Sequence, residues 1–191
     1  MRHAWLRDWW LFVRRFLHAP RSVGSIAPSS PVLVRAMLDA AEVERRQVLV
    51  ELGAGTGVVT AELLRRMPTD ATLLVFEIDE HFVTALRKRF ADPRVRIIQA
   101  SATELPKYLD HAGVDHADCI VSSLPIGSLP RDTTHAILRS IRACLDQGDV
   151  FVTYQYTPVR LGMLRASFPT MRIVGIILGN LPPALVLRCA V

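Results

Sequence analysis

The stretch VLVELGAGTG, residues 48–57, decides the fold class of this 191-residue chain. Its first half is an apolar run interrupted only by a Glu, which is typical of a strand buried on both faces of a sheet. Three glycines follow at alternate positions, and a helical pattern begins at Val58. Glycine permits a sharp turn and lets a ligand come against the main chain. The stretch therefore predicts a strand–turn–helix unit with a ligand-binding turn.

Outward from this unit, apolar runs alternate with helical patterns. We expect helices over about 31–41, 58–66, 80–90, 131–145 and 159–166, and strands over 47–52, 72–77, 95–100, 117–123, 149–156, 171–178 and 184–191. Alternation predicts right-handed βαβ crossovers and a mainly parallel sheet. A short turn joins the last two strands, so they must be antiparallel. The expected fold is α/β: a seven-stranded, mostly parallel sheet with an antiparallel C-terminal hairpin and helices on both faces.

Composition is that of a folded domain with reduced cysteines. Half of the residues are hydrophobic and 21% are charged, which is enough apolar material for a packed core. Cys119, Cys144 and Cys189 are far apart and odd in number, so we expect three reduced thiols rather than disulfides or a zinc site. The histidines make no pair at metal-ligand spacing, and we expect no metal. His116, with aspartates beside it, is a candidate proton relay.

The first 21 residues are predicted to be a separate amphipathic helix. They contain five arginines against Asp8, a local balance of +4 within a net charge of +5. Eight apolar side chains between Trp5 and Leu17, including all three tryptophans, fall on one arc of a helix, and most of the charged residues lie opposite. Residues 22–191 are then the folded domain.

Two interpretations of this helix stay open. Its aromatic face packs on the domain, or it lies in a membrane interface with arginines at anionic headgroups. The pair Arg14-Arg15 breaks the apolar run, which argues against a signal peptide. No apolar stretch reaches the roughly 18 residues of a membrane-spanning helix. We expect a cytoplasmic protein, peripherally associated with an anionic membrane surface and without an obligate protein partner.

The glycine turn resembles one family in particular. A dinucleotide site has the spacing GxGxxG, whereas here the third glycine comes one place early, and no Walker loop is present. ELGAGTG, residues 51–57, resembles motif I of the class I S-adenosylmethionine-dependent methyltransferases, which have a Rossmann-like fold. In that family the turn holds the amino-acid end of the cofactor. A structural turn in another Rossmann-like domain is the alternative.

Glu77 agrees with this resemblance. It ends the second expected strand, 24 positions after the first glycine of the turn, and an acidic residue at this spacing accepts hydrogen bonds from both ribose hydroxyls. FEID, residues 76–79, resembles the family's second motif and leaves Asp79 to cap the next helix. Where the family has Asp-Ala near the adenine, this chain has Ser101-Ala102. The resemblance implies that these residues bind the cofactor: Ser30, Glu51, Gly53, Ala54, Gly55, Thr56, Gly57, Glu77, Ile78, Ser101, Ala102 and Ser122.

The end of the fourth expected strand bears on the methyl acceptor. Adenine N6 methyltransferases carry Asn/Asp-Pro-Pro-Tyr or Asn-Leu-Pro-Tyr there, in which Asn binds the amine and the aromatic ring stacks on a flipped base. Here Ser123 and Ile126 replace both groups. The core resembles ribosomal RNA adenine dimethylases, but we find neither their C-terminal RNA-binding domain nor a basic surface. We expect no nucleic-acid partner, and an rRNA adenine N6-dimethyltransferase-like enzyme is the alternative.

Four other segments indicate a lipid acceptor. They are PRSVGSIAPSS (20–30), SLPIGSLP (123–130), TYQYTP (153–158) and GNLPPALV (179–186), and they are similar, in this order, to segments of bacterial phospholipid N-methyltransferases. The resemblance implies methylation of phosphatidylethanolamine and its methylated forms toward phosphatidylcholine at the membrane surface. This chain departs from typical members at Ser123 and Ile126, where a glycine and an aromatic residue are common. The lipid headgroup range therefore stays open.

Tyr154 and Tyr156 are candidates to hold the acceptor amine. They lie two apart at the carboxyl end of the fifth strand, where ligands of open α/β sheets bind, and so they face one side. Aromatic faces attract methylated ammonium groups, although tyrosines packed in a strand core are the alternative. With Ser123 they are the predicted catalytic residues. A non-catalytic module that has kept its cofactor site is a third hypothesis, against which the intact ELGAGTG and Glu77 argue.

Overall fold

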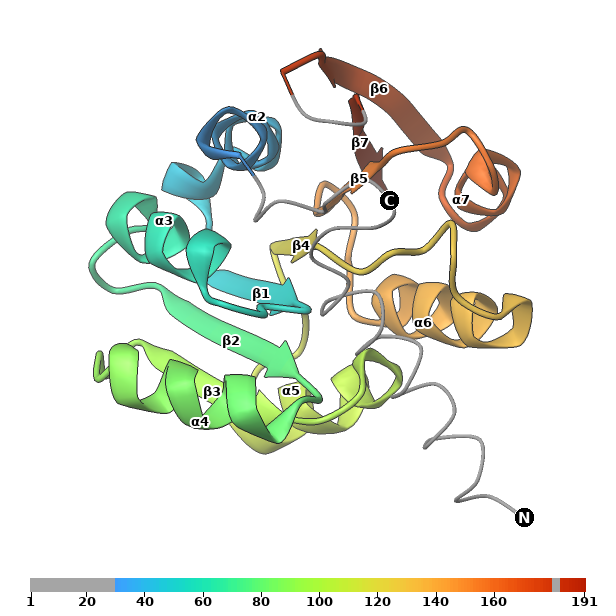
Figure 1. Ribbon diagram of the computed structural model, residues 1–191. Coiled ribbons are helices and arrows are strands. Elements are labelled where there is room, and N and C mark those ends of the chain that lie inside the picture. The colour runs from blue at the N-terminus through green and yellow to red at the C-terminus, as the bar shows by residue number, and fades with distance from the viewer. Residues whose placement is uncertain (1–29, 180–182) are drawn as a thin grey trace.

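The computed structural model describes residues 30–179 and 183–191, and its centre is a seven-stranded sheet (Figure 1). The strands are β1 (Val48–Leu52), β2 (Thr72–Glu77), β3 (Val95–Gln99), β4 (Cys119–Ser122), β5 (Val150–Gln155), β6 (Thr170–Ile177) and β7 (Ala184–Ala190). Their order is β3-β2-β1-β4-β5-β7-β6. The pairs from β3 to β5 are parallel, and β7 is antiparallel to both of its neighbours. The predicted α/β fold is confirmed.

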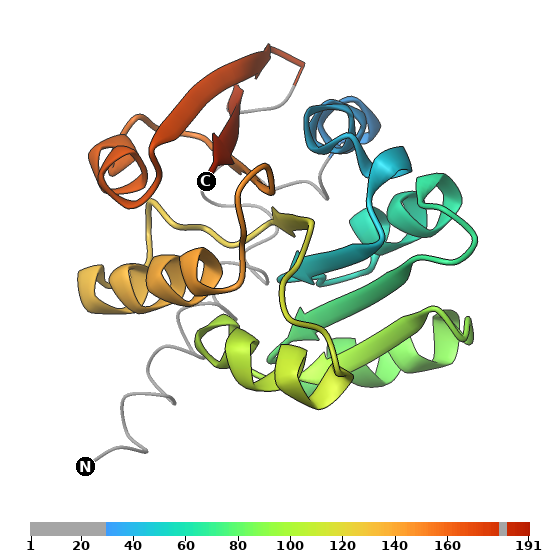
Figure 2. The same cartoon turned by 180° about the vertical axis from the view of Figure 1, so that it is seen from behind.

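Helices cover both faces of this sheet (Figures 1 and 2). They are α2 (Pro31–Ala41), α3 (Val58–Arg66), α4 (Glu80–Arg89), α5 (Leu105–Ala112), α6 (Arg131–Ala143) and α7 (Leu161–Ser167), with short 3-10 helices η1 (Val43–Arg45) and η2 (Ala102–Glu104). One core lies between the sheet and α2, α3 and α4, and the other between the sheet and α5, α6 and α7. Strand β1 serves both, because Leu49 points into the first and Val50 into the second.

Helix α5 is the element that the sequence analysis did not predict. Ser101 and Glu104 form a capping box before it, and Gly113 ends it in a left-handed conformation at φ 73°. Its Tyr108 contacts Phe76 edge to face at 5.6 Å between ring centroids and packs against the core. Each of the other elements expected within the described residues is present, with its ends shifted by at most two residues.

All three cysteines lie in the core. Cys119, Cys144 and Cys189 are free and buried. Burial in apolar surroundings raises the pKa of each thiol to about 12, so these thiols are not nucleophiles at neutral pH.

The predicted N-terminal helix, residues 1–21, lies outside the described residues. Among the residues that are described, no helix combines the length and the apolar character needed to span a bilayer.

The order of the strands fixes where a ligand binds. Successive strands add outward from β1 through β2 to β3, and then the chain returns to place β4 on the other side of β1. Such a reversal leaves a crevice beyond the carboxyl ends of the two central strands, which is where open α/β sheets bind ligands. The loops that follow β1, β2, β4 and β5 all reach this edge.

Candidate functional site

The glycine turn after β1 combines two tight contacts with one open position. Gly53, Gly55 and Gly57 have φ values of +77°, +51° and +79°, a left-handed conformation that favours glycine. A Cβ at Gly53 would lie 2.8 Å from Leu124 Cδ2, and one at Gly57 would lie 2.6 Å from the Phe90 ring. At Gly55 no atom of the residues that the structure describes comes within 4 Å of that position. The outer glycines therefore serve packing, and the middle one leaves room for a ligand.

Glu77 holds this turn from the end of β2. Its Oε2 accepts a hydrogen bond from Gly55 N at 2.8 Å, and its Oε1 accepts from Ile78 N at 2.7 Å and Asp79 N at 3.0 Å. A carboxylate offers about four acceptor positions, so three are used and Oε2 has room for one more donor. Two ribose hydroxyls would share that oxygen or displace a backbone donor. Asp79 caps α4 through His81 N and Phe82 N, as predicted.

Glu51 is a buried carboxyl group with one unpartnered oxygen. Its Oε2 accepts a hydrogen bond from the Thr60 hydroxyl at 2.6 Å, whereas Oε1 is buried without a partner. Desolvation is the main cause that raises its pKa from 4.5 to about 8, and the negative charge of Glu77 adds to the shift. A buried acceptor without a donor is unfavourable. The ammonium group at the amino-acid end of S-adenosylmethionine would satisfy it, so this residue fits the cofactor.

The three serines that are predicted to bind the cofactor are hydrogen-bonded within the protein. Ser30 caps α2 by accepting from Leu33 N at 3.2 Å. Ser101 Oγ accepts from Thr103 N at 3.3 Å, and Ser122 Oγ accepts from Leu124 N at 3.2 Å. A hydroxyl that accepts a bond still has its own proton to donate, so each can bind a cofactor atom.

The other predicted cofactor residues offer backbone atoms at this edge. Ala54 O accepts from Gly57 N, Thr56 O accepts from Arg89, and Ala102 O accepts from the Ser140 hydroxyl. Glu51, Glu77 and Ser122 lie within the last two residues of β1, β2 and β4, and the other predicted cofactor residues lie in the loops at this edge or at the adjoining helix starts. Their roles stay predictions.

A small pocket of about 70 Å³ brings the three predicted catalytic residues together. It is lined by Ser123, Leu124, Pro125, Gly127, Ser128, Tyr154, Gln155, Tyr156 and Thr157. Tyr156 lies one residue beyond β5, yet its ring meets that of Tyr154 edge to face, with centroids 5.4 Å apart. Ligand pockets usually measure about 300–1,000 Å³, so this pocket has the size of a small polar group. We call it the acceptor pocket.

Gln155 is a pocket residue that the sequence analysis missed. Strand alternation places it opposite the two tyrosines, but β5 ends here and the side chain turns into the same pocket. Its Oε1 accepts from Gly127 N at 3.0 Å, which fixes the amide orientation, and its Nε2 is buried without a partner. Ser123 Oγ is also buried without a partner. Two unsatisfied polar groups in one pocket indicate a polar ligand.

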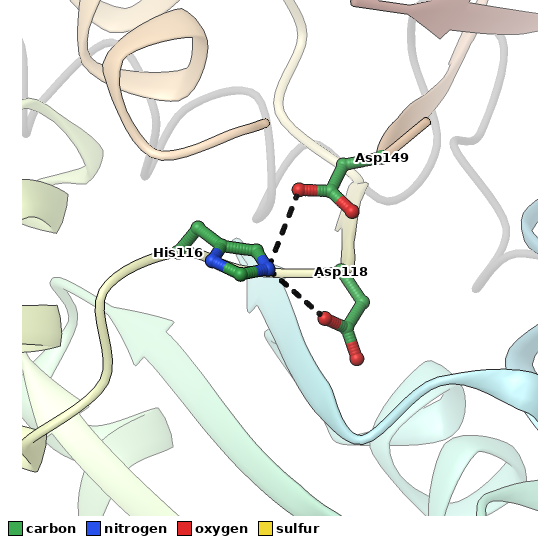
Figure 3. Close-up of side chains that lie close together, drawn as sticks. All are labelled: His116, Asp118 and Asp149. Carbon is green, nitrogen blue, oxygen red and sulfur yellow. Dashed lines mark ion pairs between the residues drawn. The ribbon is translucent and has the colours of Figure 1, made fainter. Parts of the chain in front are cut away.

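His116 lies at the other edge of the sheet (Figure 3). Its Nε2 is 3.6 Å from Asp118 Oδ1 and 3.9 Å from Asp149 Oδ2, and these aspartates directly precede β4 and β5. Asp118 Oδ2 accepts from Gln47 N and Val48 N. This cluster fastens the amino ends of the central strands. It is a strand length from the acceptor pocket, which argues against the predicted proton relay.

Known proteins with similar sequences and structures support the methyltransferase resemblance of the glycine turn. Residues 49–148 match the model of a family described as "Methyltransferase domain". The chain is 33% identical over 147 residues to an ornithine lipid N-methyltransferase of Singulisphaera acidiphila, covering 76% of this chain and 77% of that protein. It is 36% identical over 95 residues to a ribosomal RNA small subunit methyltransferase A of Treponema pallidum, covering 50% of this chain and 31% of that protein.

The T. thermophilus 16S rRNA N2 G1207 methyltransferase RsmC, solved with AdoMet and guanosine, has the same fold. It superimposes with a TM-score of 0.64 at 22% identity, covering 89% of this chain and 44% of that chain. The chain therefore belongs to the S-adenosylmethionine-dependent methyltransferases of the Methyltransferase domain family. The family resemblance of the glycine turn is confirmed. The chain spans less than a third of the Treponema rRNA enzyme and less than half of RsmC.

Proposed function

We propose that this enzyme methylates the amine of a lipid headgroup, converting phosphatidylethanolamine and its methylated forms toward phosphatidylcholine at a membrane surface. The main support is the acceptor pocket, in which two tyrosine rings stand beside the unsatisfied Ser123 and Gln155. Aromatic rings attract the methylated ammonium that such a reaction makes. The similarity to an ornithine lipid N-methyltransferase supports a lipid amine as acceptor.

The pocket residues position an amine that has already lost its proton. When bound, S-adenosylmethionine supplies an electrophilic methyl group on a sulfonium. In this proposal Ser123 Oγ, which is buried without a partner, accepts an N–H of the amine, and Gln155 Nε2, also without a partner, donates to an oxygen of the headgroup. None of the described residues that line the pocket has a carboxylate or an imidazole. The amine therefore enters in its neutral form, and positioning provides most of the acceleration.

The geometry disfavours a nucleic-acid base in this pocket. Ile126, which stands where adenine methyltransferases have a stacking aromatic ring, is buried in the core at 1% exposure. A base therefore has no ring to stack on at this position.

Transfer from labelled S-adenosylmethionine tests the proposal. The acceptors are vesicles with phosphatidylethanolamine, vesicles with an ornithine lipid, vesicles of phosphatidylcholine alone, and ribosomal RNA. We expect label in the lipid extract from amine-containing vesicles only, and none with the Tyr154→Ala, Tyr156→Ala double variant. Label in RNA alone, or in neither, would overturn the proposal. Label in the ornithine lipid alone would keep the lipid amine and reject phosphatidylethanolamine.

We further propose that residues 1–21 hold the enzyme at an anionic membrane from the cytoplasmic side. These residues lie outside the described part of the chain, and the proposal rests on their arginines and tryptophans.

A further inference from the structure

A groove separate from the acceptor pocket runs between α6 and α7, which lie side by side in both views (Figures 1 and 2). Its volume is about 610 Å³, within the usual range for a ligand site. Val159, Met163 and Ala166 give it an apolar side, and Val159 is 56% exposed. Arg131 and Arg160 give it a cationic side. A groove with both characters matches an amphiphile that has an acidic group and a hydrocarbon chain.

The two guanidinium groups are available to an anion. Among the ion pairs of the described residues, neither Arg131 nor Arg160 takes part in one. Arg160 Nη1 donates to Thr134 Oγ1 at 2.8 Å, which leaves its other N–H groups for a ligand. Arginine forks match the oxygens of phosphate and carboxylate groups.

One backbone feature favours a negative charge at the same place. Helix α6 begins at Arg131 after Pro130, and no side chain caps its first N–H groups. Unsatisfied N–H groups at a helix start attract anions. Asp132, in that first turn, does not line the groove. Arg160 holds a left-handed φ of 72°, unusual for a residue other than glycine, directly before α7.

One loop connects the groove to the acceptor pocket. Thr157 lines the pocket, and Val159 and Arg160 line the groove. Gly127, which also lines the pocket, lies in the loop after β4. A Cβ at Gly127 would lie 3.8 Å from Val159 O, so this loop contacts the loop after β5 there. Three residues span at most about 10 Å of chain. A single lipid headgroup with the start of an acyl chain covers that distance.

We infer that the groove between α6 and α7 binds the acidic group and the adjoining acyl segment of the lipid whose amine enters the acceptor pocket. Arg131 and Arg160 hold the phosphate or carboxylate, and the Val159, Met163 and Ala166 side receives the chain. This inference rests on the proposed function. It adds that the substrate must carry an acidic group besides its amine.

Kinetics with two acceptors test the inference. One acceptor is a short-chain phosphatidylethanolamine below its micelle concentration, and the other is a long-chain alkylamine, which has an amine and a chain but no acidic group. The variants are Arg131→Gln, Arg160→Gln and the control Arg139→Gln, which removes an exposed charge from α6 outside the groove. Arg131 is exposed and makes no hydrogen bond within the described residues, so its replacement does not threaten folding.

We expect Arg131→Gln and Arg160→Gln each to raise the KM for the phospholipid about tenfold, the effect of one lost charge-assisted contact. Their kcat, their affinity for S-adenosylhomocysteine and their KM for the alkylamine should match those of Arg139→Gln. A phospholipid KM that is the same in all three variants would overturn the inference that the groove binds the lipid, while the proposed lipid methylation would stand. An equal rise in the KM for the phospholipid and the KM for the alkylamine would also overturn this inference. A wild-type protein that binds S-adenosylhomocysteine but methylates neither acceptor would reject the proposed function and the groove with it.

Discussion

Replacing Glu51 by Gln should abolish a pH dependence of cofactor binding. The carboxyl group is fully buried, and desolvation above all raises its pKa to about 8, so it is mostly protonated at neutral pH without cofactor. An ammonium group that arrives at the unpartnered Oε1 favours the carboxylate. Cofactor binding therefore releases a proton from Glu51. The Gln side chain keeps an acceptor for the Thr60 hydroxyl but has no proton to release.

The expected size of this effect follows from the pKa. Between about pH 6 and pH 7.5 the wild-type Kd for S-adenosylhomocysteine should fall about tenfold per pH unit, in total about 30-fold or 2 kcal/mol. Calorimetric titration in two buffers of different ionisation enthalpy measures both the Kd and the released protons. Glu51→Gln should show a flat Kd and release no proton. The wild-type slope persisting in Glu51→Gln would refute the placement of the ammonium group at Glu51.

The same residue predicts how the cofactor-free protein responds to pH. Its folded pKa of about 8 lies above the ordinary value of 4.5. The protonated Glu51 therefore makes its full contribution to the free energy of unfolding below about pH 4.5, and this contribution is lost as the pH rises through about 8. From pH 5 to pH 7.5 the loss is about 3 kcal/mol of unfolding free energy. Urea unfolding should show this loss in the wild type and a smaller one in Glu51→Gln.

Four further changes test other parts of the site. Glu77→Ala should weaken S-adenosylhomocysteine binding by about 3 kcal/mol in calorimetry, since it removes a charged acceptor; an unchanged Kd would show that the ribose binds elsewhere. Gly57→Ala should cost about 2–4 kcal/mol in urea unfolding, because its φ is +79° and the new Cβ meets Phe90; a neutral result would mean that the turn adapts. Tyr154→Ala should slow lipid methylation more than it weakens S-adenosylhomocysteine binding, with Tyr154→Phe milder; full turnover in Tyr154→Ala would remove the ring from the mechanism. Deleting residues 1–20 should reduce co-sedimentation with anionic vesicles, and raising salt should weaken but not abolish wild-type binding; equal sedimentation of both proteins would end the anchor proposal.

The glycine turn and its neighbouring elements could be predicted because the rules that place them are local. The strand, the three glycines and Glu77 follow one another within 30 residues, and each has a conformational reason to be where it is. Helix α5 was equally predictable, since Ser101, Glu104 and Gly113 are ordinary start and stop signals. Ser101 is predicted above only as a residue near the adenine, so the helix start that it makes is absent from the expected elements.

The acceptor half depends on contacts that no local pattern reveals. Gln155 enters the pocket because β5 ends at that residue and Gly127, from a distant loop, holds its amide oxygen. The groove needs α6 and α7 to lie together, so that Arg131 and Arg160 meet although 28 residues separate them. Tertiary placement, rather than residue type, makes these side chains functional.

The reversal of strand order beside β1 has a consequence for substitutions at this edge of the sheet. Residues 51–102 carry most of the predicted cofactor residues, and residues 122–160 carry the acceptor pocket and the loop that leads to the groove. A substitution in the acceptor loop therefore need not alter the glycine turn. The two segments meet at the contact of Gly53 with Leu124, where a Cβ would come to 2.8 Å of a side-chain carbon. At position 124 the acceptor loop is therefore limited to side chains that can pack directly against the backbone of Gly53.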